Sequence, residues 1–179
     1  MTPTPSPAPP RSSREIKVRR IRSAEWAAHR ELRLKALASD PMAFGSTLAR
    51  EREFSEDLWK ERTDRGASSM ESALWVADTG EGTLVGMASV VFLDGRWHLF
   101  AMWVEPTYRG HGLGARLLDA SIAWFRDVAP GQPLHLDVNP RQGAAARLYE
   151  GRGFRRTGTS GPLGHTEGQT FVSLVLDVM

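Results

Sequence analysis

The sequence predicts one mixed α/β domain whose sheet contains both antiparallel and parallel strands. Three apolar segments in the middle of the chain are separated by tight-turn sequences, which predicts consecutive hairpins. Helix-like and strand-like segments then alternate, which favours a parallel crossover. The chain has 179 residues, beginning with a Pro/Ser/Thr-rich stretch. We expect residues 1–14 to be disordered and residues 15–179 to form the domain, which is long enough to bury about 70% of its unfolded surface.

The first half of the chain predicts a strand, two helices and three further strands. Residues 16–21 alternate apolar and basic, which is typical of a half-exposed strand. Ser23 is a suitable N-cap for the first helix, which the following Asp-Pro pair would end. After a loop at 42–47, residues 51–63 predict a second, more polar helix. The strands are predicted over 73–78, 83–93 and 96–104.

The second half predicts two helices and two strands. Apolar residues at helical spacing, from about Gly112 to Val128, indicate a helix with a broad buried face. Residues 134–138 read as a buried strand, residues 139–153 as a capped helix and residues 170–178 as a final strand. The sequence GTSGPLGHTEG (158–168) is expected to be irregular.

Composition excludes several classes of protein. There is no cysteine, so disulfide frameworks, zinc-thiolate sites and thiol nucleophiles are ruled out. The longest apolar run, residues 84–93, has 10 residues, whereas a membrane span needs about 20. The N-terminus lacks the basic start and apolar stretch of a signal peptide, so we expect a cytoplasmic protein without a membrane partner.

Charge is concentrated near the N-terminus. Residues 11–22 hold six basic side chains and one acidic one, so this segment carries +5 and the remainder of the chain −3. Such an arm could contact nucleic acid or an acidic partner, but it has no interleaved aromatic residues. We therefore interpret it as a solvated segment that leads into an edge strand, and do not expect a nucleic-acid partner.

Three glycines at alternate positions join a predicted strand to a predicted helix. Arg109 precedes Gly110, Gly112 and Gly114, and we call residues 109–114 the glycine segment. Glycine lets a ligand approach the main chain, and the N–H groups at a helix start attract anions. A pyrophosphate would suit this site. The spacing differs from the dinucleotide fingerprint, and no lysine completes a P-loop.

The segment VEPTYRGHGLG resembles the acyl-CoA-binding signature of the GNAT family of N-acetyltransferases, Gln/Arg-x-x-Gly-x-Gly/Ala. Arg109, Gly112 and Gly114 fill its defined positions. NPRQGAAARLYEGRGF is similar to a second family segment, and DPMAFGSTLARE to the loop between the first two helices. The resemblance implies a central mixed, mostly antiparallel sheet flanked by helices and splayed at the strands ending near Val104 and Val138.

The resemblance also implies acetyl-CoA as co-substrate, no metal, and a set of binding residues. The main chain at Met102 and Val104 would pair with the pantetheine arm, and the Met102 N–H would hold the thioester carbonyl. Asn139 would cap the next helix or hydrogen-bond the arm. The pyrophosphate would lie on the glycine segment, formed by Arg109, Gly110, His111, Gly112, Leu113 and Gly114.

Tyr149 is the expected general acid, since a phenol beside the sulfur can protonate the departing thiolate. The general base is open. Many family members have a glutamate where this chain has His98, and histidine titrates in a suitable range. Glu105, Glu51 and a water relay are the alternatives. The remaining histidines that we considered as metal ligands, His29, His135 and His165, show no metal-binding spacing.

The sequence therefore predicts direct transfer of an acetyl group from acetyl-CoA to an amine, without a covalent intermediate. The acceptor, a small-molecule or peptide amine, would be selected by residues 44–47 (Phe44, Gly45, Ser46, Thr47), by Trp103 and by residues 158–168. The alternative function is a non-catalytic acyl-CoA-binding module with a basic interaction arm. A homodimer is left open.

Overall fold

A seven-stranded sheet runs through the part of the chain that the computed structural model describes, residues 16–80, 82–162 and 168–177. Its strand order is β1-β2-β3-β4-β5-β7-β6, and only β4 and β5 pair in parallel. The expected disordered tail, residues 1–14, lies outside the described residues. The strands are β1 (Lys17–Arg20), β2 (Ser72–Asp78), β3 (Leu84–Leu93), β4 (Arg96–Val104), β5 (Leu134–Val138), β6 (Arg155–Pro162) and β7 (Thr170–Leu176).

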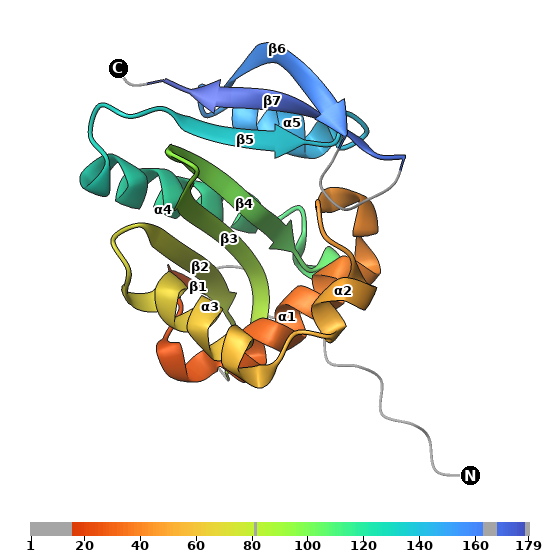
Figure 1. The fold of residues 1–179 in the computed structure, drawn as a ribbon, viewed down its shortest axis with the longest axis vertical. Coiled ribbons are helices and arrows are strands. Elements are labelled where there is room, and N and C mark those ends of the chain that lie inside the picture. Colours follow the sequence, from red (N-terminus) through yellow and green to blue (C-terminus); the bar gives the residue numbers. More distant parts are fainter. Residues whose placement is uncertain (1–15, 81, 163–167, 178–179) are drawn as a thin grey trace.

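Helices cover the two faces of the sheet unequally (Figure 1). One face carries α1 (Trp26–Ser39), α2 (Leu48–Arg52) and α3 (Glu56–Ser68). The other carries α4 (Leu113–Val128) and α5 (Gly143–Glu150). The mixed, mostly antiparallel sheet expected from the sequence is thus confirmed. Among the described residues, no helix is both long and apolar enough to cross a bilayer. Three short 3-10 turns complete the elements: η1 (Ser23–Glu25), η2 (Pro41–Ala43) and η3 (Pro106–Tyr108).

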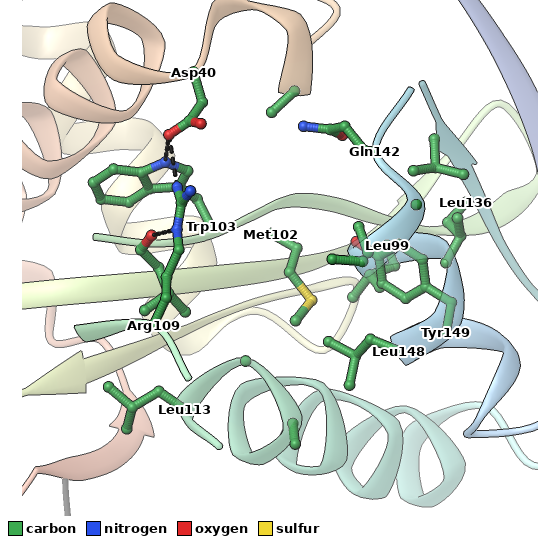
Figure 2. Close-up of a pocket in the computed structure, with 18 of the residues that line it drawn as sticks. Asp40, Leu99, Met102, Trp103, Arg109, Leu113, Leu136, Gln142, Leu148 and Tyr149 are labelled. Atoms are coloured by element: carbon green, nitrogen blue, oxygen red, sulfur yellow. Dashed lines mark hydrogen bonds and ion pairs between the residues drawn. The ribbon is translucent and has the colours of Figure 1, made fainter. Parts of the chain in front are cut away.

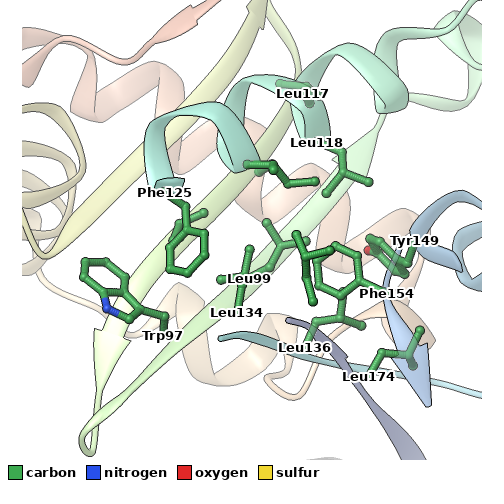
Figure 3. Close-up of a cluster of buried hydrophobic side chains, with 14 of the residues drawn as sticks. Trp97, Leu99, Leu117, Leu118, Phe125, Leu134, Leu136, Tyr149, Phe154 and Leu174 are labelled. Atoms are coloured by element: carbon green, nitrogen blue, oxygen red, sulfur yellow. The ribbon is translucent and has the colours of Figure 1, made fainter. Parts of the chain in front are cut away.

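Two cores hold the helices on the sheet. The α4-side core places the broad apolar face of α4 against β3, β4, β5 and β7, as Figure 3 shows, and Trp97 meets Phe125 edge-on at 5.7 Å between ring centroids. This confirms the buried face expected for α4. The α1-side core includes Leu32, Leu37, Phe44, Met87 and Trp103.

The start of the first helix and the single polar helix were predicted wrongly. The turn η1 precedes α1, and Ser23 donates a hydrogen bond to Asp64 instead of capping the helix. The polar region forms two helices, α2 and α3, because two separate N-caps are present. The hydroxyl of Thr47 accepts a hydrogen bond from the N–H of Arg50, and that of Ser55 accepts one from the N–H of Leu58.

The second half of the chain departs from the prediction at β6 and α5. Residues 155–162 form an edge strand whose side chains are almost all exposed, so no alternation of apolar residues announces it. Helix α5 begins at Gly143 and not directly after Asn139. The Asn139 side chain accepts a hydrogen bond from the N–H of Arg141 instead, which makes a local turn before the helix.

Part of the basic arm belongs to the fold. Arg19 forms ion pairs with Glu25 at 2.6 Å and with Asp78 at 2.8 Å. The Arg20 guanidinium donates hydrogen bonds to three main-chain carbonyls, between Gly66 and Ser72, and lies 5.3 Å from the ring centroid of Trp124. The arm leads into an edge strand, as expected, and on that strand Arg19 and Arg20 are bonded to neighbouring residues and are not freely solvated.

Candidate active site

The parallel strands β4 and β5 separate soon after they meet. Their paired residues are Trp97 with Leu134 and His98 with His135. Beyond these pairs a cavity of about 640 Å³ opens between the strands, the glycine segment and α5 (Figure 2). The splay expected near Val104 and Val138 is present, and both residues line the cavity.

A β-bulge in β4 directs side chains into this cavity. Ser89 of β3 pairs with Phe100 and Met87 with Trp103, so two residues of β4, Ala101 and Met102, oppose one residue of β3. Ala101 has a φ of 54°, in the left-handed region that non-glycine residues rarely occupy. The bulge reverses the alternation of the strand: Met102 turns toward the α4 side and lines the cavity.

The glycine segment leads from η3 into the first turn of α4. Gly110 and Gly112 have φ values of 79° and 77°, and a Cβ on either would meet no atom within 4 Å. Gly112 is the N-cap residue of α4, a helix of 16 residues. The first N–H groups of a helix lack intrahelical partners and carry the positive end of its dipole. This open stretch of main chain can therefore accept an anion such as a pyrophosphate.

Arg109 lines the cavity, but its guanidinium is engaged by the protein. Its Nε donates to the carbonyl of Val104 at 2.8 Å, and its Nη2 donates to the carboxylate of Asp40 at 2.7 Å. The Trp103 indole donates to the same carboxylate oxygen at 2.7 Å. Burial would raise the pKa of Asp40, but the hydrogen bonds from Arg109, Trp103 and Ser39 outweigh it and lower that pKa.

Tyr149 of α5 faces the cavity from the side opposite Asp40 (Figure 2). The residue is 7% exposed, and its ring packs edge-on against Phe154 at 5.9 Å between centroids. Burial raises the pKa of the phenol above its usual value, so the hydroxyl keeps its proton at neutral pH. No hydrogen bond joins the hydroxyl to any residue in the described ranges.

The candidate general bases do not line the cavity. His98 stacks on Phe100 at 5.2 Å between centroids, and burial together with the nearby His135 lowers its pKa. Glu105 forms an ion pair with Lys35 at 2.7 Å. Glu51 is 1% exposed and held by Arg33 through hydrogen bonds of 2.7 and 3.0 Å. These bonds, together with the charges of Arg33 and Arg62, outweigh burial and lower the pKa of Glu51, so its carboxylate is already engaged by cations away from the cavity.

Other sequence-predicted residues lie at or beside the cavity. Leu113 and Gly114 line it, whereas His111 is exposed and outside its lining. Asn139 is 5% exposed and joins the end of β5 to Gln169 through a hydrogen bond of 3.4 Å. Phe44 is buried, and the Arg33 guanidinium lies over its ring, 4.5 Å from the centroid of that ring. Of residues 158–168, which were expected to be irregular and to select the acceptor, residues 158–162 belong to β6 and residues 163–167 lie outside the described residues.

Sequence reasoning missed two carboxylates in the lining, Asp40 and Asp137. Asp40 was considered only as the end of a helix. Asp137 is the exposed residue of β5, in which Asp137 and the half-buried His135 alternate with buried apolar residues, and it accepts a hydrogen bond from Ser173 at 2.5 Å. That alternation was a usable signal. Within the described residues, no group of three or more His, Cys, Asp or Glu side chains could hold a metal ion.

A sheet opened between two parallel strands, with a helix start that can accept an anion on one side and a buried phenol on the other, can accommodate an elongated phosphate-bearing ligand. The family model of the Acetyltransferase (GNAT) family matches residues 25–154. The chain therefore belongs to the GNAT family of acetyltransferases.

Relatives and solved structures agree with this assignment. The chain is 34% identical over 90 residues to a peptidyl-lysine N-acetyltransferase of Salmonella typhimurium, covering 50% of this chain and 55% of that protein. It is 36% identical over 89 residues to an N-alpha-acetyltransferase of Mycobacterium tuberculosis, covering 47% and 53%. The chain thus spans about half the length of these relatives.

The fold resembles that of a GNAT-family acetyltransferase from Streptococcus pneumoniae, with a TM-score of 0.76 at 21% identity, covering 92% of this chain and 99% of that one. It also resembles a putative acetyltransferase from Salmonella typhimurium solved with acetyl-CoA, with a TM-score of 0.71 at 22% identity, covering 92% and 94%.

Proposed function

We propose that the protein transfers the acetyl group of acetyl-CoA directly to an amine. The observation that carries the proposal is the single cavity in which the glycine segment, the bulged part of β4 and Tyr149 meet. These are the parts that thioester aminolysis needs: an anion site, a donor for the carbonyl oxygen and an acid for the leaving sulfur.

The described residues fit acetyl-CoA. The pyrophosphate would lie on the main-chain N–H groups of residues 109–114, where Gly110 and Gly112 leave open space. Beyond Trp97 and His98, no described residue of β5 pairs with β4, so the main chain of β4 is available to the amides of a pantetheine arm. Met102 and Val104 line the gap in which that arm would lie.

The chemistry follows from the groups around the thioester. The amine nitrogen attacks the carbonyl carbon, a C–N bond forms, and the C–S bond breaks. The carbonyl oxygen gains negative charge during attack, which a hydrogen bond from the Met102 N–H at the bulge would stabilise. Tyr149 then donates its proton to the departing sulfur, and the proton lost by the amine restores the phenol through solvent.

The amine must lose a proton before or during attack, since amines are largely protonated at neutral pH. None of His98, Glu105 and Glu51 lines the cavity, so direct transfer to them is not supported. The Asp40 carboxylate already accepts hydrogen bonds from Trp103 and Arg109. The geometry favours the water relay, with Asp137 as the cavity-lining carboxylate that is available to it.

The acceptor class follows from the relatives only in outline. Two of them are described as acting on peptidyl-lysine and on α-amines, and a third, from Streptomyces avermitilis, as an L-2,4-diaminobutyric acid acetyltransferase. We therefore propose a primary amine carried by a peptide, a protein or a small molecule.

The test measures release of the CoA thiol from acetyl-CoA with a panel of amines. The panel holds peptides with a free N-terminus, peptides with a blocked N-terminus and one lysine, and small diamines. Acceptor-dependent release with one class identifies the enzyme and its substrate class. Calorimetric binding of CoA without release by any amine would favour the non-catalytic module, and absence of binding would refute both.

A further inference from the structure

Asp40, which follows α1, is the point at which three parts of the site meet (Figure 2). Its Oδ2 accepts hydrogen bonds from the Trp103 indole and from the Arg109 Nη2, both at 2.7 Å. Trp103 belongs to β4 just beyond the bulge, and Arg109 opens the glycine segment. Asp40 itself begins the connection to α2, where Ala43 also lines the cavity. The Asp40 carboxylate thus joins the connection between α1 and α2 to β4 and to the glycine segment.

The second hydrogen bond of Arg109 makes this connection rigid. Its Nε donates to the carbonyl of Val104, the last residue of β4, while its Nη2 reaches Asp40. The guanidinium is planar, so fixing two of its nitrogens fixes its orientation. The next residues, Gly110 and Gly112, have positive φ and would not touch the protein even with a Cβ. The Arg109 side chain therefore anchors the first half of the glycine segment, while the buried Leu113 and α4 hold its end.

In the ion pair between Asp40 and Arg109, the Asp40 side chain is the less exposed to solvent. The side chain of Asp40 is 27% exposed and that of Arg109 is 46% exposed, so solvent screens their ion pair in part. Trp103 is 4% exposed, and its indole N–H needs an acceptor in the protein. Asp40 supplies that acceptor and stays ionised, which holds it in place for Arg109.

We propose that Asp40 is a positioning residue for acetyl-CoA, which acts on the glycine segment through Arg109. The proposal rests on the proposed function, because it assigns a role in binding the pyrophosphate of that co-substrate. It predicts that a residue 70 positions away from Gly110, on the acceptor side of the cavity, controls affinity for the nucleotide end of CoA.

The test is a double-mutant cycle read by calorimetric titration with CoA and with ADP, which carries a pyrophosphate but no pantetheine arm. The proteins are the unaltered chain, Asp40→Ala, Arg109→Met and the double variant. We expect Asp40→Ala to weaken the binding of both ligands about tenfold and Arg109→Met at least as much, since it also removes the hydrogen bond to Val104. The double variant should bind no more weakly than Arg109→Met, because Asp40 acts through that arginine. Asp40→Asn keeps a hydrogen-bond acceptor for Trp103 and should therefore lose less ligand affinity than Asp40→Ala.

A matched control and the folded state separate this role from a general loss of stability. Asp119→Ala removes a surface ion pair, with Arg152 at 3.0 Å, from the exposed side of α4 and should leave both affinities unchanged. Should Asp40→Ala fail to fold, Asp40→Asn and Arg109→Met carry the test. Unchanged ADP affinity in folded Asp40 variants, or additive losses in the double variant, would overturn the proposal alone. Failure of the unaltered protein to bind CoA would overturn the proposed function with it.

Discussion

Tyr149 combines burial with access to the cavity, which is the environment that a general acid requires. Its raised pKa keeps the phenol protonated, and no residue of the described chain takes up its hydrogen-bonding capacity. The identity of the residue could be inferred from the sequence through its motif. Its packing on Phe154, which orients the ring, depends on how α5 closes on the sheet.

Replacing Tyr149 with phenylalanine should therefore separate binding from chemistry. The ring and its packing remain, so affinity for acetyl-CoA should barely change, while kcat should fall about 10²- to 10⁴-fold. The loss should shrink above about pH 8.5, the ordinary pKa of a thiol, because a thiolate then leaves unaided. The measurement is kcat against pH for both proteins with one amine; identical profiles would make Tyr149 a packing residue.

His29 is a buried histidine whose hydrogen bonds define its tautomer. Thr63 donates its hydroxyl proton to the carbonyl of Trp59 at 2.7 Å, so the His29 Nδ1, 2.8 Å from that hydroxyl oxygen, must be the donor. Burial lowers the pKa of His29 to about 3, and the charges of Arg62 and Arg33 contribute while Glu51 opposes them. The neutral imidazole thus packs α1 against α3, through Thr63 and the edge of the Trp59 ring.

Stability should consequently fall in acid, and His29→Gln should reduce that fall. The folded pKa is below the unfolded value of about 6.5, so the contribution of neutral His29 is complete above pH 6.5 and is lost as pH falls toward 3. The expected slope from this residue is about 1.4 kcal/mol per pH unit. Urea denaturation of both proteins at pH 7.5, 6 and 5 provides the comparison, and equal slopes would contradict the assignment.

Among the elements, the glycine segment was the easiest to anticipate and the bulge of β4 the hardest. Glycines at alternate positions before an apolar helical pattern are visible in any reading of the chain. The bulge leaves no comparable trace, since Ala101 is an ordinary strand residue with an unusual φ of 54°. It lies where β4 still pairs with β3 but no longer pairs with β5.

Gly112→Ala tests the glycine segment, with Gly95→Ala as its control. Both glycines have positive φ, 77° and 78°, and a Cβ on either meets no atom within 4 Å. Each substitution should cost about 1 kcal/mol of stability, because alanine is strained in the left-handed region. Only Gly112→Ala should also lower the affinity for acetyl-CoA, by about tenfold or more, since the alanine methyl group would enter the space that the phosphates need.

Two titrations decide the outcome for this pair: urea denaturation for stability and calorimetry for acetyl-CoA. Gly95 lies in the turn between β3 and β4 and is absent from the cavity lining. Equal affinities in the two variants would show that the phosphates do not lie against Gly112.

At the scale of the whole molecule, the N-terminal region has two parts: residues 1–14, which are rich in proline, serine and threonine, and the basic strand β1. Arg19 and Arg20 tie β1 to the sheet and to neighbouring helices. Residues 1–14 precede this strand and are rich in proline, serine and threonine. Such a composition offers little apolar surface for burial.

Deletion of residues 1–14 should therefore leave the melting temperature and the turnover of small amines unchanged. A clear decrease in either quantity, measured by thermal denaturation and by thiol release, would show that this segment packs on the domain or contributes to the acceptor site.

Arg19→Ala, in contrast to the deletion, should destabilise the protein. It removes the ion pairs to Glu25 and Asp78 and should lower the melting temperature.

The sequence by itself determined the elements with strong local signals. The hairpin strands β2, β3 and β4, the helix α4 and the strand β5 follow from period, turn residues and glycine placement, all of which act between near neighbours. Glycine spacing located the glycine segment, and the family resemblance pointed to Tyr149 as the proposed acid. Edge strand β6 carried no such signal, because its side chains are almost all exposed.

Only the tertiary structure decided which polar residues share the site. Asp40 meets Trp103 and Arg109 across more than 60 positions of the chain, while Glu51 turns inward to Arg33 and Glu105 pairs with Lys35. The sequence shows that each carboxylate is present but not which cation lies beside it once the helices are in place. Those partners determine whether a carboxylate holds structure, positions a ligand or remains available to a proton, and they come together only when distant segments pack.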